Sequence, residues 1–197
     1  MSEEHGRSLV ANHNQNGVLL IGGGQEFGRR GGTENVPHIV AMGAAAERIA
    51  SMGDLRVQAT RMEALRTRLL HQLRRQLGCE ETDDGLVRPN GPVDPAHRLP
   101  NTLSVSIRNV HSGDLLAAVS DQVAASAGAT CHSAAGVSSV LLAMQVPIEF
   151  ARGTLRLSLG PTTMPAQIDR AAAILAKAAK LQLPQKNNLR KYSSVEI

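Results

Sequence analysis

The chain has 197 residues, 42% of them hydrophobic, and carries a formal net charge of +4 at pH 7 with a pI near 9.6. This length predicts one domain, or one domain with an attached segment, and the apolar content is enough for an ordinary core. The chain contains no apolar run of membrane-spanning length, and its first ten residues, MSEEHGRSLV, match neither a secretory signal nor a transit peptide. We therefore expect a cytoplasmic protein with no membrane partner.

The basic residues do not predict a nucleic-acid partner. Nucleic-acid-binding proteins interleave clustered Lys and Arg with aromatic residues or glycine, whereas this chain has two Phe, one Tyr and no Trp. Six arginines fall within one helical pattern, and we interpret them as a solvated helix face: Arg56, Arg61, Arg66, Arg68, Arg74 and Arg75. The two cysteines, Cys79 and Cys131, are too few for a disulfide framework or a metal cluster.

The N-terminal part of the chain is polar and then rich in glycine. Residues 1–16 show no pattern, and we expect them to be disordered or adventitious. The apolar run 17–21, a candidate strand end, leads into GGGQEFGRRGGTENVP at 22–37. Glycine at this density lets the backbone turn sharply or approach a ligand. The stretch contains no GK[ST] and is not a P-loop, nor is it the GxGxxG fingerprint in its usual strand-to-helix context.

Hydrophobic spacing predicts the remaining elements in chain order. Helices are expected from about 36 to 51 and from about 54 to 77, where apolar residues recur every three or four positions and Gly78 follows as a stop. A loop at 80–98 precedes a strand at 102–108. A helix at 112–119 begins at a possible Ser112 cap, 122–125 is a candidate strand, and a helix capped by Ser138 or Ser139 ends near 144. A strand at 154–159 and a helix with Pro165 in its first turn, ending near 181, complete the pattern.

Strands and helices therefore alternate, with helices covering a small sheet. This pattern predicts the α/β class, in the form of an α+β small domain with a mostly antiparallel sheet.

Three patches could carry chemistry. Cys131 lies in SAGATCHS, among small residues, where a thiolate could move towards a bound substrate; the alternative is an ordinary loop cysteine. Arg156 projects from the strand face opposite the leucines and could clamp a carboxylate, or it could be an ordinary surface arginine. Gly31, Gly32 and Thr33 could hold phosphate oxygens through backbone N–H groups and a hydroxyl, or form a simple turn before a helix.

The chain resembles the C-terminal part of selenocysteine lyases and cysteine desulfurases, class V aminotransferase-like enzymes with the aspartate aminotransferase fold. The resemblance rests on four stretches in order, GGGQEFGRRGGTENVPHIVAMGAAAE, HRLPNTLSVSIR, SAGATCHS and SSVLLAMQVPIEFARGTLRLSLG. It implies pyridoxal phosphate as the cofactor, selenocysteine or cysteine as the amino-acid substrate and alanine as a product. The form GATCHS is more similar to the selenocysteine lyases.

The resemblance implies roles for four residues, and together with the sequence pattern it divides the chain into four parts. Cys131 is the expected catalytic residue that accepts sulfur or selenium, Arg156 binds the substrate carboxylate, and Gly32 with Thr33 reaches the cofactor phosphate across a dimer. No metal is expected. The parts are a loose N-terminus (1–16), a glycine-rich cofactor and dimer segment with a linker helix (17–52), a small C-terminal domain (53–181) and a polar tail (182–197).

The sequence also departs from the family. Where family members read RLSxGRxTT this chain reads RLSLGPTTM, so Pro161 and Met164 differ. The family's Schiff-base lysine precedes the GGGQE stretch, whereas the four lysines here are Lys177, Lys180, Lys186 and Lys191. We therefore expect a truncated form that is inactive alone, with doubtful binding of the cofactor, in a homodimer or mixed dimer. The alternative is a non-catalytic interaction module that forms a mixed dimer with a full-length family member.

Overall fold

A computed structural model describes residues 20–79, 85–92, 94–127 and 137–184 of the chain. The chain divides into two compact units, one ending at Gly53 and one beginning at Asp54. The described part of the first unit contains α2 (Gln25–Gly28) and α3 (Val36–Ser51). The four-part organisation expected from the sequence stays a prediction.

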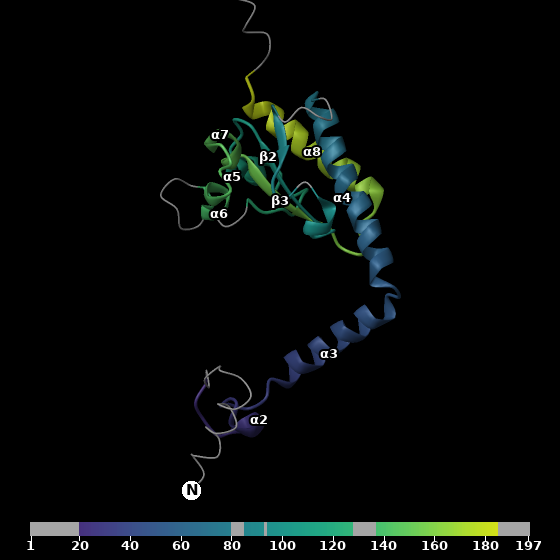
Figure 1. The fold of residues 1–197 in the computed structure, drawn as a ribbon, viewed down its shortest axis with the longest axis vertical. Coiled ribbons are helices and arrows are strands. Elements are labelled where there is room, and N and C mark those ends of the chain that lie inside the picture. Colours follow the sequence, from purple (N-terminus) through teal and green to yellow (C-terminus); the bar gives the residue numbers. More distant parts are fainter. Residues whose placement is uncertain (1–19, 80–84, 93, 128–136, 185–197) are drawn as a thin grey trace, which may run out of the picture. The chain divides into compact units, whose positions relative to one another are not determined.

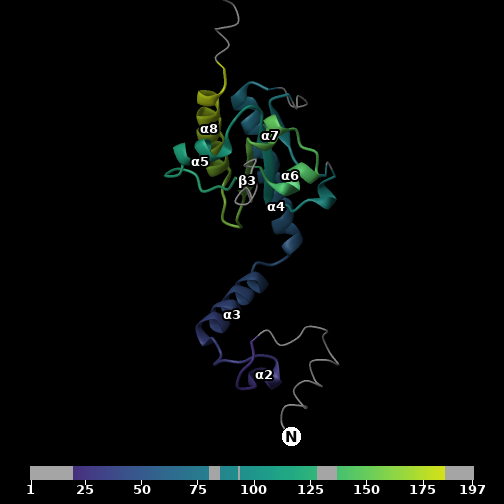
Figure 2. The same ribbon diagram turned by 90° about the vertical axis from the view of Figure 1, so that its left-hand side faces the viewer.

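The second unit is a three-stranded antiparallel sheet with helices on both sides (Figures 1 and 2). Its elements are, in chain order, α4 (Leu55–Leu77), β1 (Val87–Pro89), the 3-10 helix η1 (Pro95–His97), β2 (Thr102–Ile107), α5 (Ser112–Ala118), α6 (Ser139–Ala143), α7 (Ile148–Ala151), β3 (Thr154–Ser158) and α8 (Pro165–Gln182). The strand order is β1-β2-β3. The expected fold class, a small antiparallel sheet with helices, is confirmed.

One face of the sheet forms the main core. Strand residues alternate between faces, so Leu103, Val105 and Ile107 of β2 share a face with Leu155 and Leu157 of β3, and all five are buried. Figure 1 shows α4 and α8 side by side over one face of the sheet, with α6 and α7 on the opposite side. A smaller apolar cluster under α6 and α7 contains Val137, Leu141, Val146, Phe150 and Ala151.

The two long helices begin and end where local chemistry dictates. At the start of α4 the Asp54 carboxylate accepts a hydrogen bond of 2.8 Å from the Arg56 backbone N–H, which is typical N-capping. Gly78 follows the last turn with a φ of 73°, a left-handed conformation that glycine adopts without strain. Pro165 stands in the first turn of α8, where its missing N–H removes no helical hydrogen bond.

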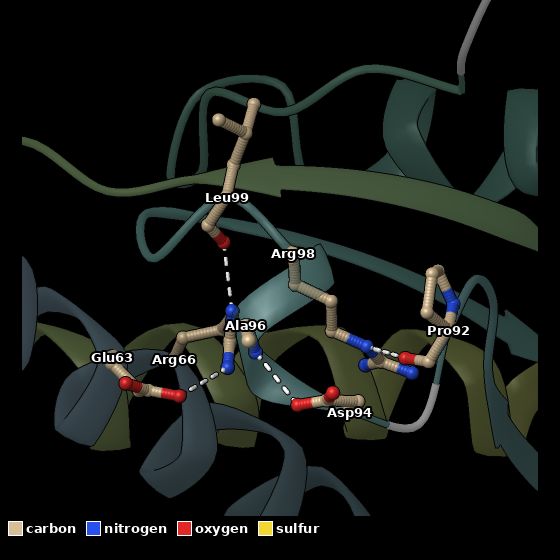
Figure 3. Close-up of polar contacts among 7 residues, drawn as sticks. All are labelled: Glu63, Arg66, Pro92, Asp94, Ala96, Arg98 and Leu99. Atoms are coloured by element: carbon tan, nitrogen blue, oxygen red, sulfur yellow. Dashed lines mark hydrogen bonds and ion pairs between the residues drawn. The ribbon is translucent and has the colours of Figure 1, made fainter.

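Four arginines of α4 make tertiary contacts. The solvated-face interpretation was wrong for Arg61, Arg66 and Arg74, which are buried or half-buried, whereas Arg68 stays exposed. Arg66 is 6% exposed and donates to the Leu99 carbonyl at 2.7 Å and to Glu63 at 3.0 Å; Figure 3 shows it between these two groups. Arg61 donates to the carbonyls of Pro161 and Thr163, Arg68 to both Asp169 oxygens, and Arg74 to the Val87 carbonyl. Spacing alone places arginines on a helix but cannot reveal which carbonyls lie opposite.

The structure differs from the sequence expectations in three further elements. The loop expected at 80–98 contains β1, a strand too short and too close to proline to give a periodic signal. The segment 122–125 is not a strand, and only Ser126 pairs with β3, through an isolated bridge. The side chains expected to cap α5 and α6 make no capping hydrogen bond.

None of the described helices is long and apolar enough to cross a lipid bilayer.

Candidate functional site

Arg156 occupies the centre of β3, on the face that points away from the main core. It is the register partner of Ser104 in β2. On its other side, the Arg156 N–H donates to the Ser126 carbonyl at 2.6 Å and the Ser126 N–H donates to the Arg156 carbonyl at 3.2 Å. The side chain is exposed. Within the described part of the chain, no hydrogen bond or ion pair involves its guanidinium, so its donors are available to an anion.

Asn90 and Ser104 extend this row across the sheet. The Asn90 N–H donates to the Ser104 carbonyl at 2.9 Å and thereby continues the ladder one residue past β1. Its side-chain amide donates to the Ser104 hydroxyl at 3.2 Å and to the Ser106 hydroxyl at 2.8 Å. Asn90, Ser104, Arg156 and Ser126 therefore lie side by side in four neighbouring segments. We call this set the polar row.

A buried chain of hydroxyl groups lies beside the polar row. The Ser106 and Thr154 hydroxyl oxygens are 2.7 Å apart, and the Thr154 hydroxyl donates to the Phe150 carbonyl at 3.4 Å. Because that carbonyl can only accept, Thr154 must accept from Ser106, and Ser106 must in turn accept from Asn90. The donor and the acceptor of each hydrogen bond in this chain are thus determined. The Asn90 Oδ1 remains buried without a partner among the described residues.

Sequence reasoning did not identify Asn90 or Ser104. The alternation in TLSVSI already places Ser104 and Ser106 opposite the leucine face. The sequence does not reveal the register that sets Ser104 opposite Arg156, because pairing with β3 crosses a long connection. Asn90 follows β1, a strand that the sequence did not predict, so no sequence pattern marked Asn90 as a candidate functional residue.

Gly32 and Thr33 lie in the first unit, in a glycine turn. Gly31 donates its N–H to the Leu20 carbonyl at 2.6 Å, and a side chain there would come within 2.7 Å of the Gly22 backbone. Gly32 has a φ of 86°. The Thr33 carbonyl accepts a hydrogen bond of 3.1 Å from the Arg30 guanidinium, which also lies 3.5 Å from Glu26.

The Thr33 side chain is exposed, and no hydrogen bond from the described residues occupies its hydroxyl or the Gly32 N–H. An exposed hydroxyl next in sequence to a backbone N–H that has no partner among the described residues fits one edge of a phosphate group. The described residues therefore fit the phosphate end of a cofactor such as pyridoxal phosphate.

Cys131 lies outside the described residues. Ser126, at the end of the polar row, precedes it by five positions in the sequence. Arg156 lies in the second unit and Gly32 with Thr33 in the first. The roles expected for Cys131, Arg156, Gly32 and Thr33 stay predictions at this point.

A groove of about 490 Å³ lies between α8, the end of β3 and the segment 121–124. Its walls include Leu157 from β3, Leu159 directly after the strand, and Ile168, Arg170 and Ile174 from α8. Ser158, on the same strand face as Arg156, also lines it. No group of His, Cys, Asp or Glu that could hold a metal ion occurs among the described residues.

Comparisons with known proteins agree with one another. The family model described as aminotransferase class-V matches residues 22–171. The chain is 37% identical to the selenocysteine lyase of Bos taurus over 163 residues, which is 81% of this chain and 36% of the relative. It is 38% identical to a cysteine desulfurase of Rhodobacter capsulatus over 159 residues, 80% of this chain and 38% of the relative.

Solved structures give the same result. A NifS-like protein matches with a TM-score of 0.64 and 32% identity, covering 86% of this chain and 40% of the other. A NifS-like protein from Rickettsia africae matches with a TM-score of 0.67 and 26% identity, covering 86% and 41%. The chain thus spans well under half the length of each of these four proteins.

Proposed function

The chain belongs to the class-V aminotransferase family, and we propose that it supplies the substrate-side part of a selenocysteine lyase or cysteine desulfurase. Enzymes of these families depend on pyridoxal phosphate, which withdraws electrons from the bound amino acid. The relatives that match include both selenocysteine lyases and cysteine desulfurases at similar identity, so both substrates belong to the proposal. The full reaction would remove selenium or sulfur from the amino acid and leave alanine.

The observation that carries the proposal is the unpartnered guanidinium of Arg156. Its backbone pairs with Ser126 through two hydrogen bonds and lies opposite Ser104 in register, while its side chain is exposed and free of polar contacts with the described residues. A guanidinium on such a strand presents a planar set of donors that matches a carboxylate. We assign to Arg156 the α-carboxylate of the substrate.

Two further roles complete the proposal. Cys131 accepts the sulfur or selenium atom on its Sγ and retains it as a persulfide-type group. Thr33 and Gly32 hold an edge of the cofactor phosphate, from one subunit to the other in a dimer. These roles are supported by the match of the family model to the segment that contains all three residues.

This chain is proposed to be inactive alone. Its lysines all follow the matched region, and of the four, Lys177 and Lys180 belong to α8. Neither lies near the glycine turn in sequence. Nothing in the described residues or the comparisons favours the alternative of a non-catalytic interaction module.

Two measurements test the proposal. The purified chain with pyridoxal phosphate should release no alanine from selenocysteine or cysteine, and borohydride treatment should label no single lysine. Alanine release, or one defined labelled lysine, would contradict the inactivity.

The carboxylate role is tested by titrating acetate into the isotope-labelled chain at constant ionic strength while following arginine side-chain NMR signals. Arg156→Gln should abolish the saturable response. The control is Arg152→Gln, because Arg152 is also exposed and its side chain has no hydrogen-bond or ion-pair partner among the described residues. This variant should retain the response.

A further inference from the structure

We infer that the Ser104 hydroxyl is a second donor for the carboxylate that Arg156 binds. This inference rests on the proposed role of Arg156 and adds a binding residue to it. The two residues are register partners in neighbouring antiparallel strands, so their side chains emerge from the same face with Cβ atoms about 5 Å apart. Ser104 is half-buried, and Arg156 is exposed beside it.

The hydroxyl of Ser104 has a defined hydrogen-bonding state. Its oxygen accepts a hydrogen bond from the Asn90 side-chain amide at 3.2 Å. The amide orientation is fixed by the buried chain from Asn90 through Ser106 and Thr154 to the Phe150 carbonyl. Asn90 therefore acts as a positioning residue, because its amide donates to a lone pair of the Ser104 oxygen. No acceptor for the Ser104 proton is found among the described residues, so this proton is available to a ligand.

Ser104 and Ser106 differ in this respect, although they lie two positions apart on one face of β2. Ser106 is completely buried and its proton goes to Thr154. Ser104 is accessible and keeps its proton free. Arg156 lies directly across from Ser104. In the proposed function, an anion bound to the Arg156 guanidinium is therefore the nearest charged acceptor for the Ser104 proton.

A carboxylate has the reach that this arrangement requires. Each of its two oxygens accepts a charge-assisted hydrogen bond of about 2.8 Å, so it can join donors that lie about 6 to 7 Å apart. With Cβ atoms about 5 Å apart, an arginine whose stem rises from the sheet keeps its guanidinium within this reach of the hydroxyl of its cross-strand neighbour. One carboxylate oxygen would then accept from Arg156 and the other from Ser104. The chemical class of ligand is a carboxylate of a small amino acid.

The test uses acetate titration of the full chain at constant ionic strength, followed by the Arg156 side-chain signal and the Ser104 backbone amide signal. Ser104→Ala should weaken acetate binding by about tenfold, the usual effect of one hydrogen bond to a charged group. Ser104→Thr keeps the hydroxyl and should bind within about twofold of the original chain.

Thr102→Val is the matched control. It removes a hydroxyl from the same strand face, one whose proton Asn101 accepts and whose register partner is Ser158, and it should leave acetate affinity unchanged. Equal affinity of Ser104→Ala and the original chain, with the response abolished in Arg156→Gln, would overturn the inference and leave the role of Arg156 intact. A response that survives Arg156→Gln, or its absence from the original chain, would overturn both.

Discussion

Gly153 is a position at which no side chain fits. It lies in the turn after α7, where a Cβ would collide with the Ile107 carbonyl oxygen and crowd the Val110 carbonyl at 3.0 Å. The close approach allows the Ile107 N–H to donate to the Gly153 carbonyl at 3.0 Å and so begins the pairing of β2 with β3. Glycine is therefore required here by contact between two backbones.

Gly153→Ala should lower the free energy of unfolding by about 3 kcal/mol, because backbone must shift to admit the methyl group. Denaturant unfolding followed by circular dichroism measures this loss. Gly160→Ala is the control, since a Cβ at Gly160 would meet only the Thr163 hydroxyl at 3.8 Å. Equal stability of the two variants would contradict the steric argument.

Asp169 gives a second prediction at the scale of single residues. Two hydrogen bonds from the Arg68 guanidinium, at 2.8 and 2.7 Å, lower the pKa of this carboxyl below its ordinary value, and the charges of Arg68 and Arg75 act in the same direction. The folded state therefore binds this proton less readily than the unfolded state. Its stabilising effect is present above the ordinary pKa of about 3.9 and is lost as the pH falls through the lower, folded value.

Asp169→Asn should flatten the pH dependence of stability below about pH 4. Melting temperatures recorded in steps from neutral to acid pH would show this change. The control is Asp114→Asn, which removes an exposed acid 3.2 Å from His111. Parallel profiles for Asp169→Asn and the original chain would rule out the contribution of Asp169.

At the scale of elements, the arginines of α4 join the helix to the loops around it. Arg66 fixes the turn before β2 through the Leu99 carbonyl, and Arg61 fixes the turn after β3 through Pro161 and Thr163. The start of β2 and the end of β3 are thus connected to one helix. Pro161, which departs from the family pattern, provides one of the carbonyls to which Arg61 donates.

Arg66→Ala should cost about 2 kcal/mol, because it removes a buried side chain together with its charge-assisted hydrogen bond to the Leu99 carbonyl. Arg56→Ala, from the same helix, should change stability by less than about 0.5 kcal/mol, because the Arg56 side chain is exposed. Chemical denaturation of both variants gives the comparison. A similar cost for both would restore the interpretation of a solvated face.

The sequence predicts the long periodic elements well, and also the short helices α5 and α6, but it misses β1 and α7. The helices α3, α4 and α8 and the strands β2 and β3 begin and end within a residue or two of expectation, because their apolar spacing repeats often enough to be unambiguous. The strand β1 and the helix α7 are too short to repeat. The polar row depends on register between distant strands, so only Arg156 among its members could be proposed from sequence.

At the scale of the whole molecule, α3 differs from the other long helices. None of its residues is buried, and its large apolar side chains are 49% to 70% exposed: Val36, Ile39, Val40, Met42 and Ile49. A helix of 16 residues without tertiary packing is marginal in water. In α4, by contrast, Leu65, Leu69 and Leu73 are buried in the core.

Hydrogen exchange of the chain should therefore show weak protection for Val36–Ser51 and strong protection for Leu55–Leu77. Peptide-level mass spectrometry resolves the two segments. Protection of α3 equal to that of α4 would show that its apolar side chains are covered in solution, for example by self-association. A dilution series distinguishes that case, because protection by association falls as the chain is diluted.

The alternation of β3 has a consequence for insertions and deletions. Arg156 reaches the polar face because an even number of positions separates it from Thr154 and Ser158, whereas the leucines occupy the odd positions. Removing or adding one residue within the strand would reverse this parity, turning the guanidinium into the core and a leucine onto the polar face. The face on which Arg156 lies thus depends on the number of residues in the strand, and an insertion or deletion of one residue would disrupt it where many side-chain substitutions would not.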